Sequence, residues 1–178
     1  LSRNGVTIDT NRRPQQLNPF FRFRRQRKSA ILAALRSRPI REPEGAFLPS
    51  VTVLVAAYNE ARHIERTVRN KLEQDYPAEK LEVIVVSDGS EDGTDEIVRG
   101  IDDMRVRLIR QEPRAGKTSG LNLIMPDARG DVIVFSDANS LYAKDAIRRL
   151  TETLADPGVG YVTGRMVYRA PDGSLTGE

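Results

Sequence analysis

Apolar and polar positions along this chain come in blocks that predict strands and helices in turn. The clearest block is Leu81–Glu96, where the continuous apolar run Val83–Val86 stops at small and acidic residues. An apolar run without alternation is typical of a strand buried on both faces of a parallel sheet. Residues that favour a helix start follow at Asp92 and Thr94. The block therefore predicts a strand, a turn and a helix, with Asp88 at the carboxyl end of the strand.

The same succession continues on both sides of this block. Strands are predicted over residues 51–57, 81–87, 106–110 and 131–136, and helices over residues 60–74, 92–101, 117–125 and 143–155. Asn59 or Glu60 is expected to cap the first helix. A fifth strand is predicted over residues 159–169. Strands that alternate with helices indicate an α/β fold, in which a mostly parallel sheet is flanked by helices on both faces.

The first quarter of the chain differs from the rest in charge. Residues 1–41 carry 11 Lys and Arg against one Asp, whereas the remainder carries 17 against 24 Asp and Glu. We interpret residues 1–48 as a basic N-terminal arm and linker, and residues 49–178 as the α/β domain. The chain begins without Met and ends without a closing element, so we expect an incomplete domain from a longer protein.

Residues 20–41 combine eight of these cations with three Phe and a short apolar patch. This pattern predicts either contact with an anionic membrane surface or a solvated helix that packs on the domain. Nucleic acid is not an expected partner, because no stacking platform accompanies the cations.

Composition excludes several kinds of chemistry. The chain has no Cys and a single His, His63, which excludes disulfides, thiolate catalysis and a zinc site built on a cluster of His. No apolar run reaches the roughly 18–20 residues that span a bilayer.

Polar residues follow the predicted strands at their carboxyl ends, where open α/β sheets bind ligands. Tyr58 follows the first strand and is suited to stacking on a base. Asp88 ends the second strand, where its carboxylate can accept a hydrogen bond from a base imide or, alternatively, form a local turn.

Residues suited to phosphate and to a cation follow the third and fourth strands. Lys117, at a predicted helix start after Gly116, combines an ammonium with backbone N–H groups. A Walker P-loop is excluded, because Gln111 stands where that motif needs Gly. Asp137 and Asn139 are expected to project the same way from an extended segment. Such an oxygen pair suits Mg²⁺ or Mn²⁺ shared with substrate phosphates.

Four segments, VTVLVAAYNE, EVIVVSDGSEDGTDEIV, RAGKTSGLN and GDVIVFSDAN, resemble glycosyltransferase family 2 in their order and spacing. The resemblance covers Pro49–Glu178 and implies the GT-A fold, a Rossmann-like domain that binds nucleotide-diphosphosugars. It implies inverting transfer of a sugar, with UDP-sugar as the expected donor, to a polysaccharide or lipid-linked acceptor at the cytoplasmic face of the cell membrane. A non-catalytic nucleotide-sugar-binding module is the alternative.

The resemblance also implies a role for each matching position. Ala57, Tyr58 and Glu60 would line the uracil and ribose pocket, and Asp88 would bind the edge of the base. Lys117 would approach the diphosphate, with Asn122 supporting its loop.

The metal site and the catalytic base depart from the family pattern. Asp137 would be the first acid of an Asp-x-Asp motif that touches ribose or metal, and Asn139 replaces the second, which weakens the expected metal site. The family's catalytic base lies in a later half. Asp145, Glu152 and Asp156 are expected to be solvated surface residues, so no base is assigned.

Overall fold

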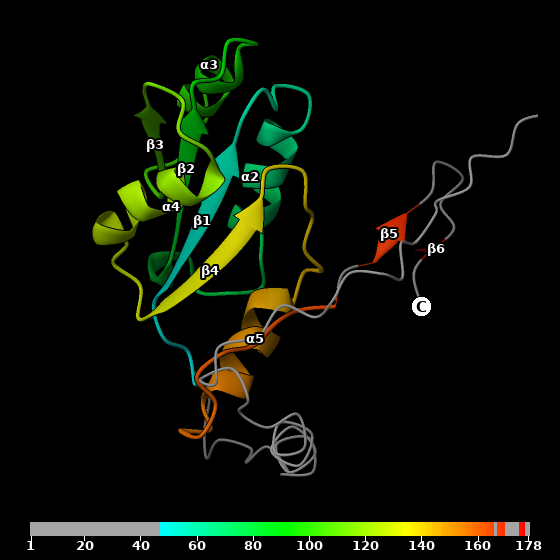
Figure 1. Cartoon of the computed structure of the whole chain (residues 1–178). Coiled ribbons are helices and arrows are strands. Elements are labelled where there is room, and N and C mark those ends of the chain that lie inside the picture. The colour runs from blue at the N-terminus through cyan, green and yellow to red at the C-terminus, as the bar shows by residue number, and fades with distance from the viewer. Residues whose placement is uncertain (1–46, 166, 170–174, 177–178) are drawn as a thin grey trace, which may run out of the picture. The chain divides into compact units, whose positions relative to one another are not determined.

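A computed structural model describes residues 47–165, 167–169 and 175–176, and its arrangement is drawn in Figure 1. The strands of the main sheet are β1 (Val51–Ala57), β2 (Leu81–Asp88), β3 (Val106–Gln111) and β4 (Val132–Asp137). The helices are α2 (Ile64–Leu72), α3 (Thr94–Arg99), α4 (Lys117–Ile124) and α5 (Ala146–Leu154), with short 3-10 turns η2 (Ala78–Lys80) and η3 (Met125–Asp127). The predicted α/β fold is confirmed.

The four strands form one parallel sheet in the order β3-β2-β1-β4. Strand β1 pairs with β2 up to Ala57 opposite Ser87, and with β4 up to Ala56 opposite Asp137. Strand β2 pairs with β3 up to Asp88 opposite Gln111. Because all four strands run in one direction, their carboxyl ends meet at one edge of the sheet.

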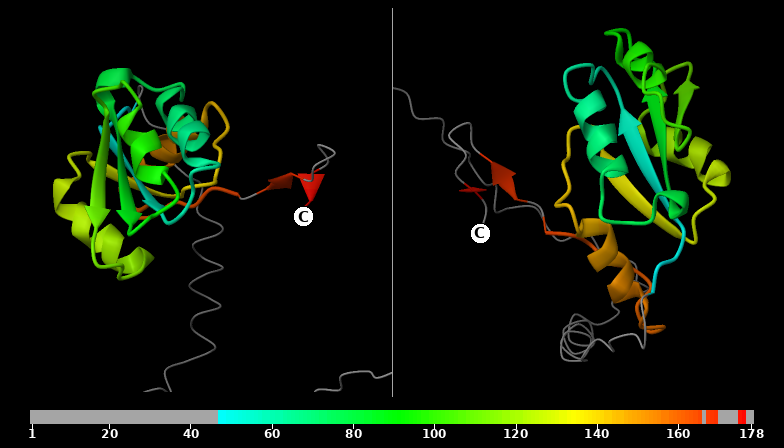
Figure 2. Two further views of the ribbon diagram at one scale, coloured as in Figure 1. Left: turned by 90° about the horizontal axis from the view of Figure 1, so that it is seen from above. Right: turned by 180° about the vertical axis from the view of Figure 1, so that it is seen from behind.

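Helices cover both faces of this sheet, and Figure 2 shows α2 and α4 on opposite sides of it. One face packs Val53, Val55 and Val85 against apolar residues of α2, α3 and α5. The other packs Leu54 and Ile84 against α4. Strands β1 and β2 are therefore buried on both faces, which explains their continuous apolar sequences.

The start of α2 corrects the predicted cap. The helix begins at Ile64 with His63 as the residue before it, and no side chain caps it. Instead, the backbone carbonyl of Glu60 accepts the N–H groups of His63 and Ile64, both at 2.9 Å. Asn59 has a positive φ of 53° and its side chain bonds to the turn after β2. A cap was the wrong prediction because that turn competes for the same side chain.

The predicted strand over residues 159–169 is wrong for most of its length. Residues 159–165 form no regular structure, and only Tyr168–Arg169 (β5) is a strand, paired antiparallel with Leu175–Thr176 (β6). Glycines at 158, 160 and 164 lower the strand propensity of this apolar stretch.

Asp156 is another correction. It is 2% exposed, and its carboxylate accepts the N–H of Gly158 at 2.8 Å in the turn after α5. A short polar side chain that closes a turn loses its solvent even at the surface of a domain.

The predicted arm, including residues 20–41, lies outside the described residues apart from residues 47 and 48. In the part of the chain that the structure describes, none of the helices combines the length and apolar character needed to cross a bilayer.

Candidate functional site

Asp88, at the carboxyl end of β2, fixes the loop that connects β3 to α4. Asp88 is 6% exposed, and its carboxylate accepts the N–H groups of Ala115 and Gly116, both at 2.9 Å. The Gln111 side chain donates to the same carboxylate, and the Arg114 guanidinium lies 3.6 Å away. Burial on its own would raise the pKa of Asp88, but these donors outweigh it and hold the pKa below its ordinary value. Asp88 is therefore an ionised clamp on this loop.

Arg114 and Tyr58 form a stacked pair over the clamped loop. The Arg114 guanidinium lies 3.7 Å from the centroid of the Tyr58 ring, and Tyr58 is 42% exposed. Gly89, with φ of 69°, leaves space for Arg114, because a Cβ there would lie 3.3 Å from the Cβ of Arg114. Flat cationic and aromatic groups of this kind stack on heterocyclic bases. Sequence reasoning missed Arg114, although a cation two residues before Gly116 and Lys117 is a signal.

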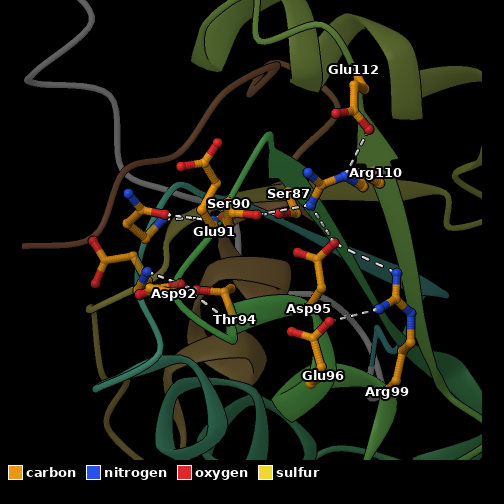
Figure 3. A network of polar contacts seen from close by, with 12 residues as sticks. Ser87, Ser90, Glu91, Asp92, Thr94, Asp95, Glu96, Arg99, Arg110 and Glu112 are labelled. Carbon is orange, nitrogen blue, oxygen red and sulfur yellow. Dashed lines mark hydrogen bonds and ion pairs between the residues drawn. The ribbon is translucent and has the colours of Figure 1, made fainter.

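The turn after β2 also holds the segment after β1, as the contacts in Figure 3 show. Ser90 Oγ accepts the N–H of Asn59 at 3.1 Å, and Thr94 Oγ1 accepts the N–H of Glu60 at 2.9 Å. The Asn59 side chain in return accepts the N–H of Glu91 at 2.9 Å. Three exchanged bonds between two strand ends make this edge of the sheet a fixed unit.

A buried carboxylate paired with arginine braces this unit from the side of β3. Asp95 is 3% exposed, and its carboxylate lies 2.9 Å from Arg110 and 3.5 Å from Arg99 (Figure 3). Arg110 also donates to the backbone carbonyl of Ser90 at 2.9 Å. Hydrogen bonds from Arg110 to Glu112 and to Asp95 raise its pKa, so the guanidinium stays charged.

An open hollow of about 390 Å³ lies over this brace, lined by the turn after β2, α3 and Arg110. Lys117 and Asp137 do not line it. The hollow is a feature of the bracing network, and the exposed strand-end groups lie apart from its lining.

Lys117 and Asp137 meet where α4 begins and β4 ends. Lys117, the first residue of α4, forms an ion pair with Asp137, the last residue of β4. Both side chains are about half exposed. Gly116 precedes Lys117 with φ of 91°, a conformation that glycine adopts freely. The structure thus brings together, at one edge, an ammonium and a carboxylate that both reach solvent.

Asp137 and Asn139 were expected to project the same way from an extended segment, and this expectation is wrong. Strand β4 ends at Asp137, and Ala138 and Asn139 form a turn, so the two side chains do not share one extended segment. Asn139 is exposed. The expected alternation failed because Ala138 is pulled into the core, where it is 3% exposed.

The donor set at this turn fits a hard divalent cation held with few protein ligands. Asp137 supplies a carboxylate and Asn139 an amide oxygen, and among the described residues no group of three His, Cys, Asp or Glu could hold a metal by itself. Mg²⁺ commonly uses one or two carboxylates together with substrate phosphates. These two residues would hold such an ion only with a phosphate ligand present.

The remaining predicted residues are placed as follows. Ala57 is buried at the end of β1, Glu60 is half-buried beside Thr94, and Asn122 is exposed on α4. The predicted site residues therefore divide between the clamped loop around Asp88 and the Lys117–Asp137 pair, with Asn122 displaying its amide from the helix between β3 and β4.

An acid, an exposed aromatic and a basic helix start lie at the carboxyl edge of this parallel α/β sheet, the edge at which open α/β folds bind their ligands. The profile of one family, described as Glycosyl transferase family 2, matches residues 52–177. The chain belongs to this family, and the resemblance read from its four motifs is confirmed.

Characterised relatives agree with this assignment. The chain is 29% identical to glycosyltransferase AglE of Haloferax volcanii over 133 residues, which are 74% of this chain and 44% of AglE. It is 37% identical to poly-beta-1,6-N-acetyl-D-glucosamine synthase of Staphylococcus aureus over 120 residues, 66% of this chain and 28% of that enzyme. The chain thus spans less than half the length of these relatives.

Solved structures confirm the GT-A fold. The mannosyltransferase PcManGT from Pyrobaculum calidifontis, in complex with GDP-Man and Mn²⁺, superposes with a TM-score of 0.64 at 37% identity, over 75% of this chain and 42% of that one. TarS of S. aureus in complex with UDP-GlcNAc superposes with a TM-score of 0.53 at 25% identity, over 56% of this chain and 29% of that one.

Proposed function

We propose that this chain is the donor-binding part of a glycosyltransferase that moves a sugar from a nucleotide-diphosphosugar to a polysaccharide or lipid-linked acceptor. The observation that carries the proposal is the meeting of Lys117 and Asp137 at the carboxyl edge of the sheet. An ammonium at a helix start attracts phosphate, and a carboxylate beside it attracts the cation that accompanies phosphate. Family membership supports the same reaction.

In this proposal the nucleoside occupies the edge formed by the ends of β1 and β2. Ala57, Tyr58 and Glu60 line the pocket for base and ribose, with the Tyr58 ring as the stacking surface. Asp88 binds the base edge: a base N–H replaces the Gln111 contact, while Ala115 and Gly116 stay bound to the carboxylate. The base would therefore bind to Asp88 while the loop between β3 and α4 keeps its backbone contacts with the same carboxylate.

The diphosphate lies over the ends of β4 and α4. Lys117 turns from Asp137 to the phosphate oxygens, and Asn122, five residues further along α4, supports the loop that carries Lys117. Asp137 and Asn139 hold Mg²⁺ or Mn²⁺, which when bound would neutralise charge on the departing nucleotide diphosphate. The acceptor hydroxyl attacks the anomeric carbon with inversion, and no residue of this chain is assigned as its base.

The location is proposed from the N-terminal sequence, and the donor from the resemblance and the solved relatives. Residues 20–41, whose basic and aromatic pattern suits an anionic membrane surface, favour the cytoplasmic face of the cell membrane. Uridine is the proposed nucleoside, which agrees with TarS and its bound UDP-GlcNAc, whereas the PcManGT structure holds GDP-Man. A binding module without turnover is the second candidate, favoured by the amide of Asn139 in place of a second acid.

Calorimetric titration of UDP and of GDP, each with and without Mn²⁺, tests the proposal on the full-length protein. We expect UDP to bind and Mn²⁺ to strengthen this binding. In a separate activity assay, we expect the protein to release UDP from a UDP-sugar. Asp137→Ala should lose both the binding and the release. Glu79→Ala, which removes an exposed acid in η2 at the opposite edge of the sheet, is the matched control and should change neither. Tight metal-independent binding without turnover would favour the binding module, and binding of neither nucleotide would overturn both candidates.

A further inference from the structure

Helix α2 carries a charged residue on its buried face. Its buried residues are Ile64, Thr67, Val68 and Lys71, a helical spacing that faces the core. Lys71 is 0% exposed. Burial of an ammonium is costly unless polar groups surround it, and an apolar residue would be cheaper at this position. The burial lowers the pKa of Lys71 to about 8. Packing alone therefore does not explain a lysine at this buried position.

Two of the three groups that surround the Lys71 ammonium belong to Ser140 and Tyr142, in the segment that follows Asn139. The Lys71 ammonium donates to the backbone carbonyl of Ser140. It lies 3.7 Å from the centroid of the Tyr142 ring and 3.5 Å from the side-chain oxygen of Asn70. Lys71 therefore holds Ser140 and Tyr142 against α2.

Asn70 makes a second, independent tie. Its side-chain oxygen accepts the N–H of Tyr142 at 2.7 Å, and its side-chain nitrogen donates to the carbonyl of Tyr142 at 3.1 Å. A side chain that satisfies both backbone groups of one residue fixes that residue in position and orientation. In Figure 1 the segment after β4 runs past α2, and the N–H of Asp75 extends the contact by donating to the carbonyl of Lys144 at 2.8 Å.

These ties leave little freedom for the turn between β4 and Ser140. Asp137 is held in the sheet opposite Ala56, and the N–H of Ser140 closes the turn on the carbonyl of Asp137 at 3.3 Å. Ala138 is buried in the core. Asn139 is thus the exposed residue of a turn that is fixed at both ends.

We propose that Asn70 and Lys71 are positioning residues, which hold the turn so that Asn139 presents its amide oxygen beside Asp137. This inference rests on the proposed function, in which those two residues hold the cation. Neither positioning residue touches the ion. Their effect on it passes through the backbone of Ser140 and Tyr142.

Mn²⁺ affinity in the presence of saturating UDP or GDP, measured on the full-length protein, tests this inference. Loss of groups that orient metal ligands typically weakens metal binding 10–100-fold, and we expect about a ten-fold loss for Asn70→Ala. Lys71→Met should also weaken binding. Removal of a nearby positive charge would by itself strengthen it, so a weaker affinity separates positioning from electrostatics. If Asn70→Ala does not fold, Lys71→Met carries the test.

Two controls separate positioning from loss of stability. Tyr76→Phe removes a hydrogen bond of 2.6 Å to the carbonyl of Pro49, before the start of β1, and should leave Mn²⁺ affinity unchanged. In an Asn139→Ala background, Asn70→Ala should cause no further loss of affinity, because its effect passes through Asn139.

The possible failures are distinct. Absence of Mn²⁺ binding by the wild-type protein, or binding that survives Asp137→Ala, would overturn the proposed metal site and this inference with it. The positioning role alone would be overturned by a different result. In that case Asp137→Ala abolishes Mn²⁺ binding, but Asn70→Ala and Lys71→Met bind Mn²⁺ as tightly as the control Tyr76→Phe does.

Discussion

Lys117 is the residue on which the proposed phosphate contact depends. We expect Lys117→Ala to weaken UDP binding by about 1–3 kcal/mol, the usual contribution of a charge-assisted hydrogen bond. Because its pair with Asp137 is half exposed, its loss should cost little stability. Calorimetry on Lys117→Ala and on Lys80→Ala, an exposed lysine of η2 at the opposite edge, gives the comparison. Equal affinities in the two variants would remove the role.

Asn139 offers a gain rather than a loss. Replacement of its neutral amide by the carboxylate of Asn139→Asp should raise the affinity for Mn²⁺ or Mg²⁺, because hard cations prefer anionic oxygen. The measurement is a metal titration with UDP present. Asp102, an exposed acid before β3, provides a matched surface control as Asp102→Asn. An unchanged affinity in Asn139→Asp would count against metal contact at this position.

Lys71 predicts a pH dependence of stability. Its pKa is about 8 in the folded protein and about 10.4 in an unfolded chain. Between these values the unfolded chain binds more protons, so the free energy of unfolding should rise with pH by about 3 kcal/mol in all. Below the folded pKa the buried charge exerts its full penalty. Lys71→Met lacks this titration, and urea denaturation from about pH 7.5 to 9.5 should give it the flatter profile. Parallel profiles would contradict the prediction.

Among the elements, the loop between β3 and α4 owes its order to one carboxylate. In Asp88→Asn an amide replaces the charged acceptor, and its NH₂ group faces other donors. We expect faster amide hydrogen exchange over residues 112–118 and a stability loss of about 1–3 kcal/mol. Asp131→Asn, which alters a carboxylate bonded to Ser50 at the opposite edge, should leave exchange in this loop unchanged.

The same carboxylate gives the loop an acid limit. The pKa of Asp88 is held below its ordinary value, so its contribution to stability is complete above about pH 3.9, the pKa of an unfolded Asp. That contribution is lost as the pH falls through the lower, folded value. The protection of amides 112–118, taken as the intrinsic exchange rate at the same pH divided by the observed rate, should therefore fall at acid pH in the wild type, and much less in Asp88→Asn. A loop whose protection stays constant across this range would contradict the clamp.

The sequence was sufficient to predict elements that are buried on both faces, because such elements have continuous apolar sequences. Strands β1 and β2 are buried on both faces and were predicted within a residue of their ends. The stretch 159–169 has apolar residues too, but its glycines lower its strand propensity, and among its described residues only Tyr168 and Arg169 pair with another strand. Local pattern reports whether a segment is apolar, whereas pairing depends on which segments it meets.

Contacts between distant residues mark the limit of sequence reasoning at the site. The sequence points to Asp88, Lys117 and Asp137 because each ends a strand or begins a helix. Their partners were not predictable from spacing, since the bond from Gly116 to Asp88 joins residues 28 positions apart. Lys71 was overlooked as one charge among many, although its helical spacing from Ile64 and Val68 placed it on the buried face.

For the molecule as a whole, the sheet predicts a gradient of stability. Strands β1 and β2 are almost fully buried at the centre, whereas β3 and β4 form its edges and are mostly half-buried, with Phe135 of β4 53% exposed. Amides that open only with the whole domain exchange most slowly, and amides with fewer buried neighbours open locally at lower cost.

Hydrogen exchange on the 178-residue chain should therefore protect β1 and β2 most strongly and β3 and β4 less. Added UDP and Mn²⁺ should slow exchange over residues 112–118 and 137–140, and should slow β1 and β2 only as far as binding stabilises the whole domain. Uniform protection of all four strands would show that the edges are stabilised by contacts beyond this sheet. Protection by UDP confined to the centre would place the nucleotide away from the carboxyl edge and contradict the proposed site.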